Sequence, residues 1–299
     1  METIIDYDLF GNVIVKDELL RDKFIEPPFS ILDSRLGGWQ KRKQLWISKG
    51  IKSEIGRDVK TYGKFTPDKG NPERFDKIST SIFDPALCEV LYHWFCDDGG
   101  KILDPFAGGS VRGIVANYMG FKYSGIEIRS EQVESNREQA MEILPINNQP
   151  QWYVGDSNKL LDGKWSVEFD MIMSCPPYAD LEVYSDLDGD ISNKPYKEFL
   201  ELYESIISKS CKLLKDGGYA CFVVGEVRDK GGDYIGFVPD TIKAFQKCGM
   251  KFYNEAILLN QSASAAMRAN GNMKTQKLVK IHQNVLIFRK PTLENKKGK

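Results

Sequence analysis

The sequence has few of the residues that form disulfide cross-links in small proteins or bind metal ions. Its 299 residues include only two histidines, and its six cysteines are scattered without a C-x-x-C pair. This pattern argues against a disulfide framework and against a zinc site, so no metal site is expected. Cysteines of this kind are typical of a reducing compartment, and we expect a cytoplasmic protein.

Long apolar runs and an excess of one charge are also missing. No run approaches the length of a membrane span, and the opening residues METIIDYDLF lack the basic start and apolar core of a secretory signal. Lysine and arginine number 41 against 42 aspartates and glutamates. A net charge of −1 gives no overall signature of nucleic-acid binding, so any basic surface has to be local.

What the sequence does contain is a glycine-rich turn between a strand and a helix. The segment KILDPFAGGS, residues 101–110, starts with a short apolar strand and leads into helical apolar spacing over residues 111–119. Gly108 and Gly109 allow the backbone to approach a bound molecule, and the helix start offers N–H groups to a carboxylate. Glu127, about twenty residues further on, is placed to accept from ribose hydroxyls. The turn is therefore expected to bind a ligand.

A second motif ends another apolar strand, in the segment DMIMSCPPY of residues 170–178. Because proline cannot continue a central strand, Cys175, Pro176, Pro177 and Tyr178 are expected to leave the sheet as a stiff loop. Open α/β sheets bind their ligands at the carboxyl ends of the strands. The two motifs are therefore predicted to meet in one crevice.

Together the two motifs resemble those of the S-adenosylmethionine-dependent DNA amino-methyltransferases of restriction-modification or phage type. The cofactor motif of that family is similar to D-P-F-x-G, and its catalytic motif is Asp, Asn or Ser followed by P-P and an aromatic residue. The resemblance covers roughly residues 78–290. It implies S-adenosylmethionine as cofactor and DNA as partner, with a flipped base if the DNA is a duplex. Cys175 departs from the family motif.

The resemblance also implies roles for individual residues. Asp104 would orient the amino-acid end of the cofactor, Glu127 the ribose and Asp156 the adenine amine, although such acids can also cap the following helix. Residues 79–83 would close over the methionine part. The residues expected to bind the cofactor are Phe83, Asp104, Pro105, Phe106, Gly108, Gly109, Ser110, Glu127, Ile128, Asp156, Ser157 and Ser174, and those expected to act in catalysis are Cys175, Pro176, Pro177 and Tyr178.

The family chemistry is methyl transfer to an exocyclic amine, either cytosine N4 or adenine N6. The first side chain of the catalytic motif and a proline carbonyl accept the amine N–H groups, and a thiol at Cys175 is a weak acceptor for this task. Cys175 also leaves open cytosine C5 methylation, in which a thiolate adds to the ring and a carboxylate such as Glu226 assists. The sequence is compatible, too, with methylation of RNA or protein amines and with a nucleic-acid-binding protein that has lost turnover.

The apolar spacing predicts a doubly wound α/β fold. Strands are predicted at residues 101–104, 122–128, 152–154, 171–174 and 219–224, and helices near residues 85–97, 111–119, 130–143, 196–214 and 238–248. This alternation implies parallel strands with right-handed crossovers. Residues 252–259 and 285–288 are predicted to close the sheet. The resemblance makes them an antiparallel hairpin at one edge of a seven-stranded, Rossmann-like class I methyltransferase sheet.

Three regions are expected: an N-terminal basic appendage (residues 1–75), the catalytic domain (76–290) and a charged, disordered tail (291–299). Between residues 35 and 64, nine lysines and arginines face two acids and are interleaved with aromatic residues such as Trp39 and Trp46. That mixture suits phosphate and base contacts, or equally a solvated face whose tryptophans form a small core.

Recognition of a DNA sequence would fall to the segments outside the sheet. These are residues 1–75, the acidic loop of residues 179–195, and residues 260–280. The acidic loop is expected to fold back on the protein or to cap the base, because acids repel a polyanion. Basic residues from Arg268 to Lys280 could frame a cleft, or simply belong to a flexible hairpin connection. So few residues predict a short or relaxed target sequence.

Overall fold

A computed structural model describes residues 26–52, 83–163, 165–178, 185, 187, 189–229, 231–260 and 265–292. Several expectations concern residues outside these ranges. They are the N-terminal arm up to residue 25, the basic stretch and linker of residues 53–82, much of the acidic loop, and the tail from residue 293.

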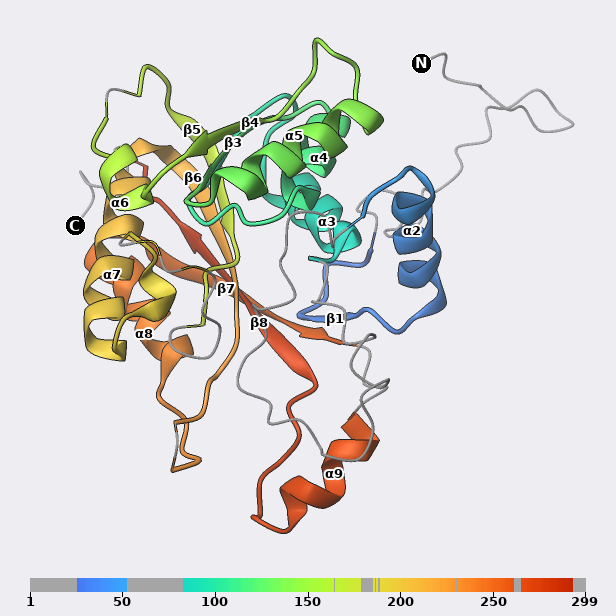
Figure 1. The fold of residues 1–299 in the computed structure, drawn as a ribbon, viewed down its shortest axis with the longest axis vertical. Helices are drawn as coiled ribbons and strands as arrows, with labels where there is room; N and C mark the ends of the chain where they lie inside the picture. The colour runs from blue at the N-terminus through green and yellow to red at the C-terminus, as the bar shows by residue number, and fades with distance from the viewer. Residues whose placement is uncertain are drawn as a thin grey trace, which may run out of the picture.

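Strands and helices alternate along most of the chain (Figure 1). The strands are β1 (Ile31–Asp33), β2 (Lys101–Asp104), β3 (Lys122–Glu127), β4 (Gln151–Val154), β5 (Phe169–Ser174), β6 (Leu214–Val224), β7 (Lys251–Leu259) and β8 (His282–Arg289). The helices are α2 (Gly37–Ser48), α3 (Pro85–Phe95), α4 (Val111–Tyr118), α5 (Ser130–Ile143), α6 (Ser157–Leu160), α7 (Tyr196–Leu213), α8 (Phe237–Lys247) and α9 (Ala265–Met273), with a 3₁₀ turn η4 (Ile191–Asn193). Within the described ranges, no helix has both the length and the apolar character needed to cross a membrane.

The described strands form one eight-stranded sheet in the order β1-β7-β8-β6-β5-β2-β3-β4. Strand β8 runs antiparallel to both β6 and β7, and the other neighbours pair in parallel. The predicted doubly wound sheet and its antiparallel hairpin are confirmed. The count rises from seven to eight strands because β1 pairs with β7, beginning with Ile31 opposite Ile257. The chain builds outward from β2 in one direction and from β5 in the other, so the order reverses between these two strands.

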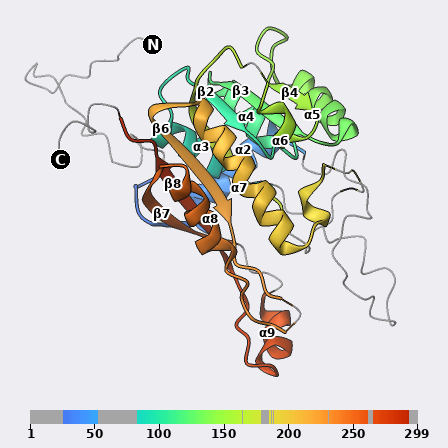
Figure 2. The ribbon, with the colours of Figure 1, turned by 90° about the vertical axis from the view of Figure 1, so that its left-hand side faces the viewer.

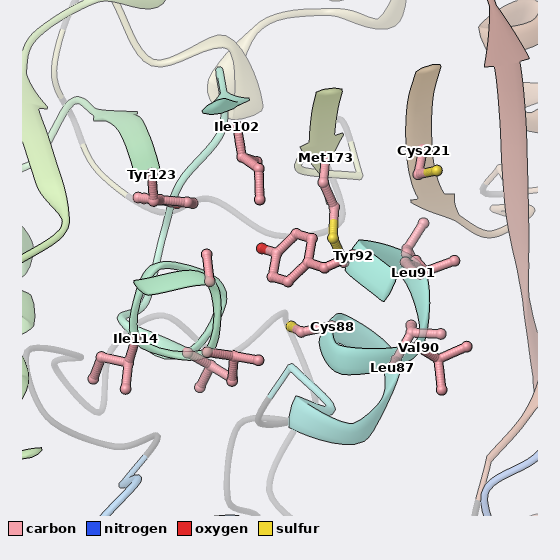
Figure 3. Close-up of a cluster of buried hydrophobic side chains, with 14 of the residues drawn as sticks. Leu87, Cys88, Val90, Leu91, Tyr92, Ile102, Ile114, Tyr123, Met173 and Cys221 are labelled. Carbon is pink, nitrogen blue, oxygen red and sulfur yellow. The ribbon is translucent and has the colours of Figure 1, made fainter. Parts of the chain in front are cut away.

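Helices cover both faces of the sheet (Figures 1 and 2). Successive side chains of a strand alternate between faces, so Ile102 joins the cluster formed with α3 and α4, whereas Leu103 joins the cluster formed with α7 and α8. Tyr92 lies in the middle of the first cluster (Figure 3). Its hydroxyl donates a 2.9 Å hydrogen bond to the carbonyl oxygen of Arg112. This bond fixes α3 to α4, the helix that follows the glycine-rich turn.

The described part of the N-terminal region packs on the sheet domain. β1 extends the sheet and α2 lies against α3 (Figure 1). Trp39 and Trp46 are only 2% and 3% exposed, and their ring nitrogens donate to Asp84 and Glu89, each over 3.1 Å. The prediction that these tryptophans stack on bases is therefore wrong, and the alternative of a small core holds. Arg42 also binds within the protein, since it forms a bidentate ion pair with Glu89 at 2.5 and 2.7 Å.

The connection between β7 and β8 differs from the plain polar segment predicted there. It contains α9 and projects well beyond the sheet in both views (Figures 1 and 2). The two chain segments meet again at the root, where the Asn260 N–H donates to the Ile281 carbonyl over 3.0 Å.

Candidate functional site

The glycine-rich turn and the catalytic loop leave neighbouring strands. β2 ends at Asp104, β5 ends at Ser174, and the two strands pair in parallel. Because the strand order reverses between them, the loops that follow diverge, and open α/β sheets bind their ligands at such a point. We call this part of the carboxyl edge, between the two loops, the crevice. Ser174 bridges the two motifs, since its hydroxyl donates to Asp104 over 2.5 Å and accepts from the Phe106 N–H at 3.2 Å. The predicted meeting of the two motifs is confirmed.

Asp104 lies at the centre of a buried hydrogen-bond network and has no exposed surface. Its carboxylate accepts from Arg112 Nε at 2.6 Å, from the Tyr123 hydroxyl at 2.8 Å and from Ser174. These three side-chain donors and the Phe106 N–H, at 3.2 Å, compensate for the lost hydration of the buried carboxylate. We call these four residues, Asp104, Arg112, Tyr123 and Ser174, the buried network.

Arg112 connects the buried network to the glycine-rich turn. Its Nη2 donates to the carbonyl oxygens of Phe106 and Ala107, over 2.7 and 2.8 Å, and the Phe83 ring lies 4.7 Å from its guanidinium carbon. Burial alone would lower the pKa of Arg112, but the charge and hydrogen bond of Asp104, with other nearby groups, raise this pKa overall. The guanidinium therefore stays charged and fixes the shape of the turn.

Several residues expected to touch the cofactor face inward instead. Asp104, Ser110 and Ser174 are buried, and the Ser110 hydroxyl donates to Gln139 over 2.5 Å. The Ser157 hydroxyl donates to the buried Pro105 carbonyl over 2.6 Å. The side chains of Asp104, Ser110 and Ser174 shape the turn from inside the protein, because a polar residue at a strand end can serve a buried network as well as a ligand. Ser157 is only half-buried, and contact of these residues with the cofactor stays a prediction.

The exposed side of the turn is open at its two glycines. Gly108 has a φ of +53°, which favours glycine, and a side chain at Gly108 or Gly109 would meet no atom of the described residues within 4 Å. The Gly108 N–H donates to Glu127 over 3.0 Å, and its carbonyl accepts from Asn136 over 2.7 Å. The turn is thus held firmly while leaving room beside the glycines.

Glu127 ends β3 beside this turn. One carboxylate oxygen accepts from the Gly108 N–H, and the other accepts from the N–H and Nε of Arg129 at 3.0 and 3.3 Å. Burial raises the pKa of Glu127, while the charge of Arg129 and the backbone donors oppose this rise. A carboxylate has about four acceptor positions, so Glu127 can accept further hydrogen bonds from a ligand.

Asp156 and Ile128 lie further along the same edge. One oxygen of Asp156 caps α6 by accepting from the Asn158 N–H at 2.8 Å, and the other lies 3.9 Å from the Lys159 ammonium. A side chain at Gly189 would come within 3.0 Å of both Asp156 Cβ and Ile128 Cδ1. The described part of the acidic loop therefore folds back on the protein, as expected. Gly189 lies where this loop approaches Asp156 and Ile128, at the carboxyl edge of the sheet.

The catalytic loop crosses from one face of the sheet to the other. Cys175 packs against the cluster formed with α3 and α4, whereas Tyr178 packs against the cluster formed with α7 and α8. Pro176 is buried between them, and Pro177 is half-buried. The four residues expected to act in catalysis therefore lie together across the carboxyl end of β5.

Tyr178 is held by two residues on other elements. Gln283 Nε2 donates to its hydroxyl over 3.0 Å, and Phe237 meets its ring edge-on at a centroid distance of 6.0 Å. Gln283 is a site residue that the sequence analysis missed. Because β8 is antiparallel, its first residues lie where β6 ends, as the pairing of Asn284 with Val224 shows. The sequence could have pointed to Gln283, because an antiparallel strand was predicted to begin near residue 285.

Lys280 and Glu226 complete this side of the crevice. The Lys280 ammonium donates to the Glu226 carbonyl over 3.3 Å and lies 2.6 Å from where a side chain would begin at Gly225. Burial lowers the pKa of Lys280, which the charge of Glu226 opposes. One carboxylate oxygen of Glu226 accepts from the Val238 N–H at 3.1 Å, and the other is buried with no hydrogen-bond partner among the described residues. Glu226 is thus directed to the start of α8.

Two protein families match the chain. The model of a DNA methylase family matches residues 169–297. The model of the Eco57I restriction-modification methylases matches residues 42–227, which is more than half of the chain. The second match spans both motifs, and the first spans the catalytic loop and the β7–β8 hairpin.

Solved structures of other methyltransferases are similar to the chain. TrmN from Thermus thermophilus is 14% identical over 70% of this chain and 49% of its own, with a TM-score of 0.47, so the chain spans about half its length. A SAM-dependent methyltransferase from Methanosarcina mazei is 14% identical over 68% of this chain and 97% of its own, with a TM-score of 0.45. Magnesium protoporphyrin IX methyltransferase from Synechocystis PCC 6803, solved with bound SAM, is 13% identical over 69% and 79%, with a TM-score of 0.42. No curated protein sequence matches the chain.

The family matches agree with the site. Both matched families are DNA methylases, and the chain brings their cofactor and catalytic motifs to one edge of an α/β sheet. The cofactor of such enzymes is S-adenosylmethionine. The chain therefore belongs to the Eco57I restriction-modification methylase family and is an S-adenosylmethionine-dependent DNA methyltransferase.

Proposed function

We propose that this enzyme methylates an exocyclic amine, cytosine N4 or adenine N6, on a base flipped out of duplex DNA. The observation that carries the proposal is the placement of the catalytic loop. Residues 175–178 lie beside the glycine-rich turn at the point where the strand order reverses, and Tyr178 is fixed by Gln283 and Phe237. A base inside a duplex cannot reach a crevice of this kind, so it has to leave the stack.

The open face of the glycine-rich turn suits the cofactor. Glu127 would accept from the ribose hydroxyls, and the outer oxygen of Asp156 would accept from the adenine amine beside Ile128 and Gly189. The glycines and the start of α4 would receive the amino-acid end, with Phe83 nearby. Asp104 and Ser174 act as positioning residues in this scheme, because both are buried. S-adenosylmethionine, when bound, supplies an electrophilic methyl group on a sulfonium.

The catalytic loop would align the target amine with that methyl group. The amine nitrogen would form a bond to the methyl carbon as the carbon–sulfur bond breaks, with the sulfur leaving as a neutral thioether, and the nitrogen would then lose a proton to water. Tyr178 would stack on the base, and the Pro176 carbonyl would accept one amine N–H. The Cys175 thiol is a weak acceptor, so positioning by the other groups has to supply most of the rate.

Nucleoside analysis tests this function. Purified enzyme is incubated with methyl-labelled S-adenosylmethionine and DNA of mixed sequence, and the digested nucleosides are analysed by mass spectrometry. Labelled N4-methylcytosine or N6-methyladenine is expected, with much less product from Pro176→Ala. Cys175→Ser should keep or raise this product, because a hydroxyl is a better acceptor than a thiol.

Other outcomes would overturn the proposal. Labelled 5-methylcytosine that disappears in Cys175→Ser would identify Cys175 as a nucleophile. Label in RNA or protein but not in DNA would move the reaction to another substrate. Cofactor binding by calorimetry without transfer to any nucleic acid would favour a binding protein.

A further inference from the structure

We propose that residues 265–281, comprising α9 and the segment that returns to β8, form a recognition arm that contacts the DNA duplex next to the flipped base. This inference rests on the proposed function. It assigns to one surface the task of holding the substrate duplex over the crevice, and it commits to DNA as the occupant of that surface.

The recognition arm has no core of its own. None of its described side chains is buried, and Met273 and Leu278 are 61% and 76% exposed. Both views show it projecting away from the sheet (Figures 1 and 2). A helix of nine residues is marginal in water without packing partners. Its exposed apolar side chains therefore indicate a surface that a partner covers.

The charge of the arm identifies that partner as a polyanion. Between residues 265 and 281 the sequence has four cations, Arg268, Lys274, Lys277 and Lys280, and no aspartate or glutamate, although the whole chain has a net charge of −1. Asn270, Asn272 and Gln276 lie among these cations, and amide side chains can read base edges. A helix of this length is about 13 Å long and fits the major groove of B-DNA.

The root of the arm lies at the crevice. The Asn260–Ile281 hydrogen bond closes the root, and Lys280 and Gln283 lie within two residues of Ile281. Gln283 contacts Tyr178, and the Lys280 ammonium lies near Gly225 and Glu226. A duplex lying along the arm would therefore present a nucleotide directly to the catalytic loop.

The arm is braced by the loop between β6 and α8. A side chain at Gly232 would collide with the Lys277 ammonium, so Lys277 lies beside this loop. The N–H groups of Asp233 and Gly232 donate to Asp229 and lower its pKa, and the charge of Lys277 adds to this lowering. In the same loop, Arg228 lies 3.9 Å above the half-exposed Tyr234 ring. This contact holds the arm at a defined angle to the crevice and adds a cation and an aromatic ring to the same surface.

The test removes charge from the arm and, separately, from the opposite edge of the sheet. The double variant Arg268→Ala/Lys274→Ala is compared with Lys122→Ala/Lys251→Ala, whose exposed lysines begin β3 and β7. Duplex affinity is measured at several salt concentrations. The arm variant should bind about tenfold more weakly, with a salt slope smaller by about two, because each phosphate contact contributes about 0.9. The control pair should bind as the wild type does.

A second variant keeps the result interpretable. Replacing residues 265–278 by a short Asn-Gly turn should leave cofactor affinity unchanged while duplex methylation falls more than tenfold. Unchanged duplex affinity and salt slope in both arm variants would show that the recognition arm does not contact DNA, but would not contradict the proposed function. Failure of the wild type to methylate any DNA would instead overturn the proposed function.

Discussion

The two sides of the crevice are built in opposite ways. On the cofactor side, the buried network places a charged pair and two hydroxyls out of contact with water. On the base side, Tyr178, Gln283 and Lys280 are half-buried. Gln283 and Phe237 contact Tyr178, and Lys280 donates to the Glu226 carbonyl. The buried network fixes one shape, whereas the half-buried side chains on the other side can adjust, as the entry of a base in the proposed function requires.

This difference has a thermodynamic consequence. A buried ion pair contributes little net stability when intact, but removing one partner leaves an uncompensated charge and costs several kcal/mol. Half-buried neutral hydrogen bonds contribute about 1 kcal/mol each. Substitutions on the cofactor side should therefore affect folding, and substitutions on the base side should affect turnover.

Arg112→Met should have the largest effect. It leaves Asp104 buried and unpaired, so the free energy of unfolding should fall by about 3–5 kcal/mol. Urea denaturation measures this loss, and Arg137→Met on the exposed side of α5 is the control, since that residue makes one hydrogen bond to the Trp152 carbonyl. Equal losses of unfolding free energy in the two variants would show that the buried ion pair is no more sensitive to substitution than an exposed arginine.

Glu127→Gln should separate binding from stability on the cofactor side. Losing a charged acceptor costs about 1.5–3 kcal/mol, so cofactor affinity should fall roughly 10- to 100-fold in calorimetry. Exposed Glu131→Gln, in the first turn of α5, is the control.

The pH dependence of Glu127 has a defined sign. Because burial raises its pKa in the folded protein, the folded state binds more protons than the unfolded state. The contribution of Glu127 to stability is therefore most favourable below the unfolded pKa and is lost as pH rises through the raised folded value. Glu127→Gln should therefore remove this part of the pH dependence of stability, which melting temperatures measured across the acidic range would show. An unchanged pH dependence in the variant would contradict the assignment.

Tyr178→Ala should reduce turnover without affecting the cofactor side. Base–aromatic stacking is worth about 1–3 kcal/mol, so kcat/KM for DNA should fall roughly 10- to 100-fold. Cofactor affinity should stay unchanged. The control is Tyr253→Ala at the opposite edge of the sheet, where the ring packs on Tyr219. An equal drop in both variants would show that Tyr178 acts through the fold.

Tyr178→Phe and Gln283→Leu should give the smallest effect. Each removes the same hydrogen bond of about 1 kcal/mol, so kcat/KM should fall about fivefold in either variant. The double variant should be no worse than the single ones, which a double-mutant cycle measures. Additive losses would mean that Gln283 acts on something other than Tyr178.

The regular core of the fold was predictable from the sequence. Apolar spacing located the strands from β2 to β8 and the long helices between them, because each element has to bury one face. β1 was not predicted, since three residues carry no period. α9 was missed because its described apolar side chains join neither hydrophobic cluster.

The site was predictable only where one motif contains it. The glycine turn, Glu127 and the catalytic loop follow from local sequence. The buried network does not, because a strand-end acid does not reveal whether it faces water or a buried arginine such as Arg112. Gln283 lies 105 residues from Tyr178, so only the pairing of β8 with β6 brings them together.

The hydrogen bond between Asn260 and Ile281 makes the segment beyond it separable from the sheet. Residues inserted or replaced between these two positions should therefore leave the strand register of β7 and β8 intact. On the proposed role of the recognition arm, related enzymes that keep this root would change their target sequence by exchanging one short segment, while the methyl-transfer chemistry stays the same.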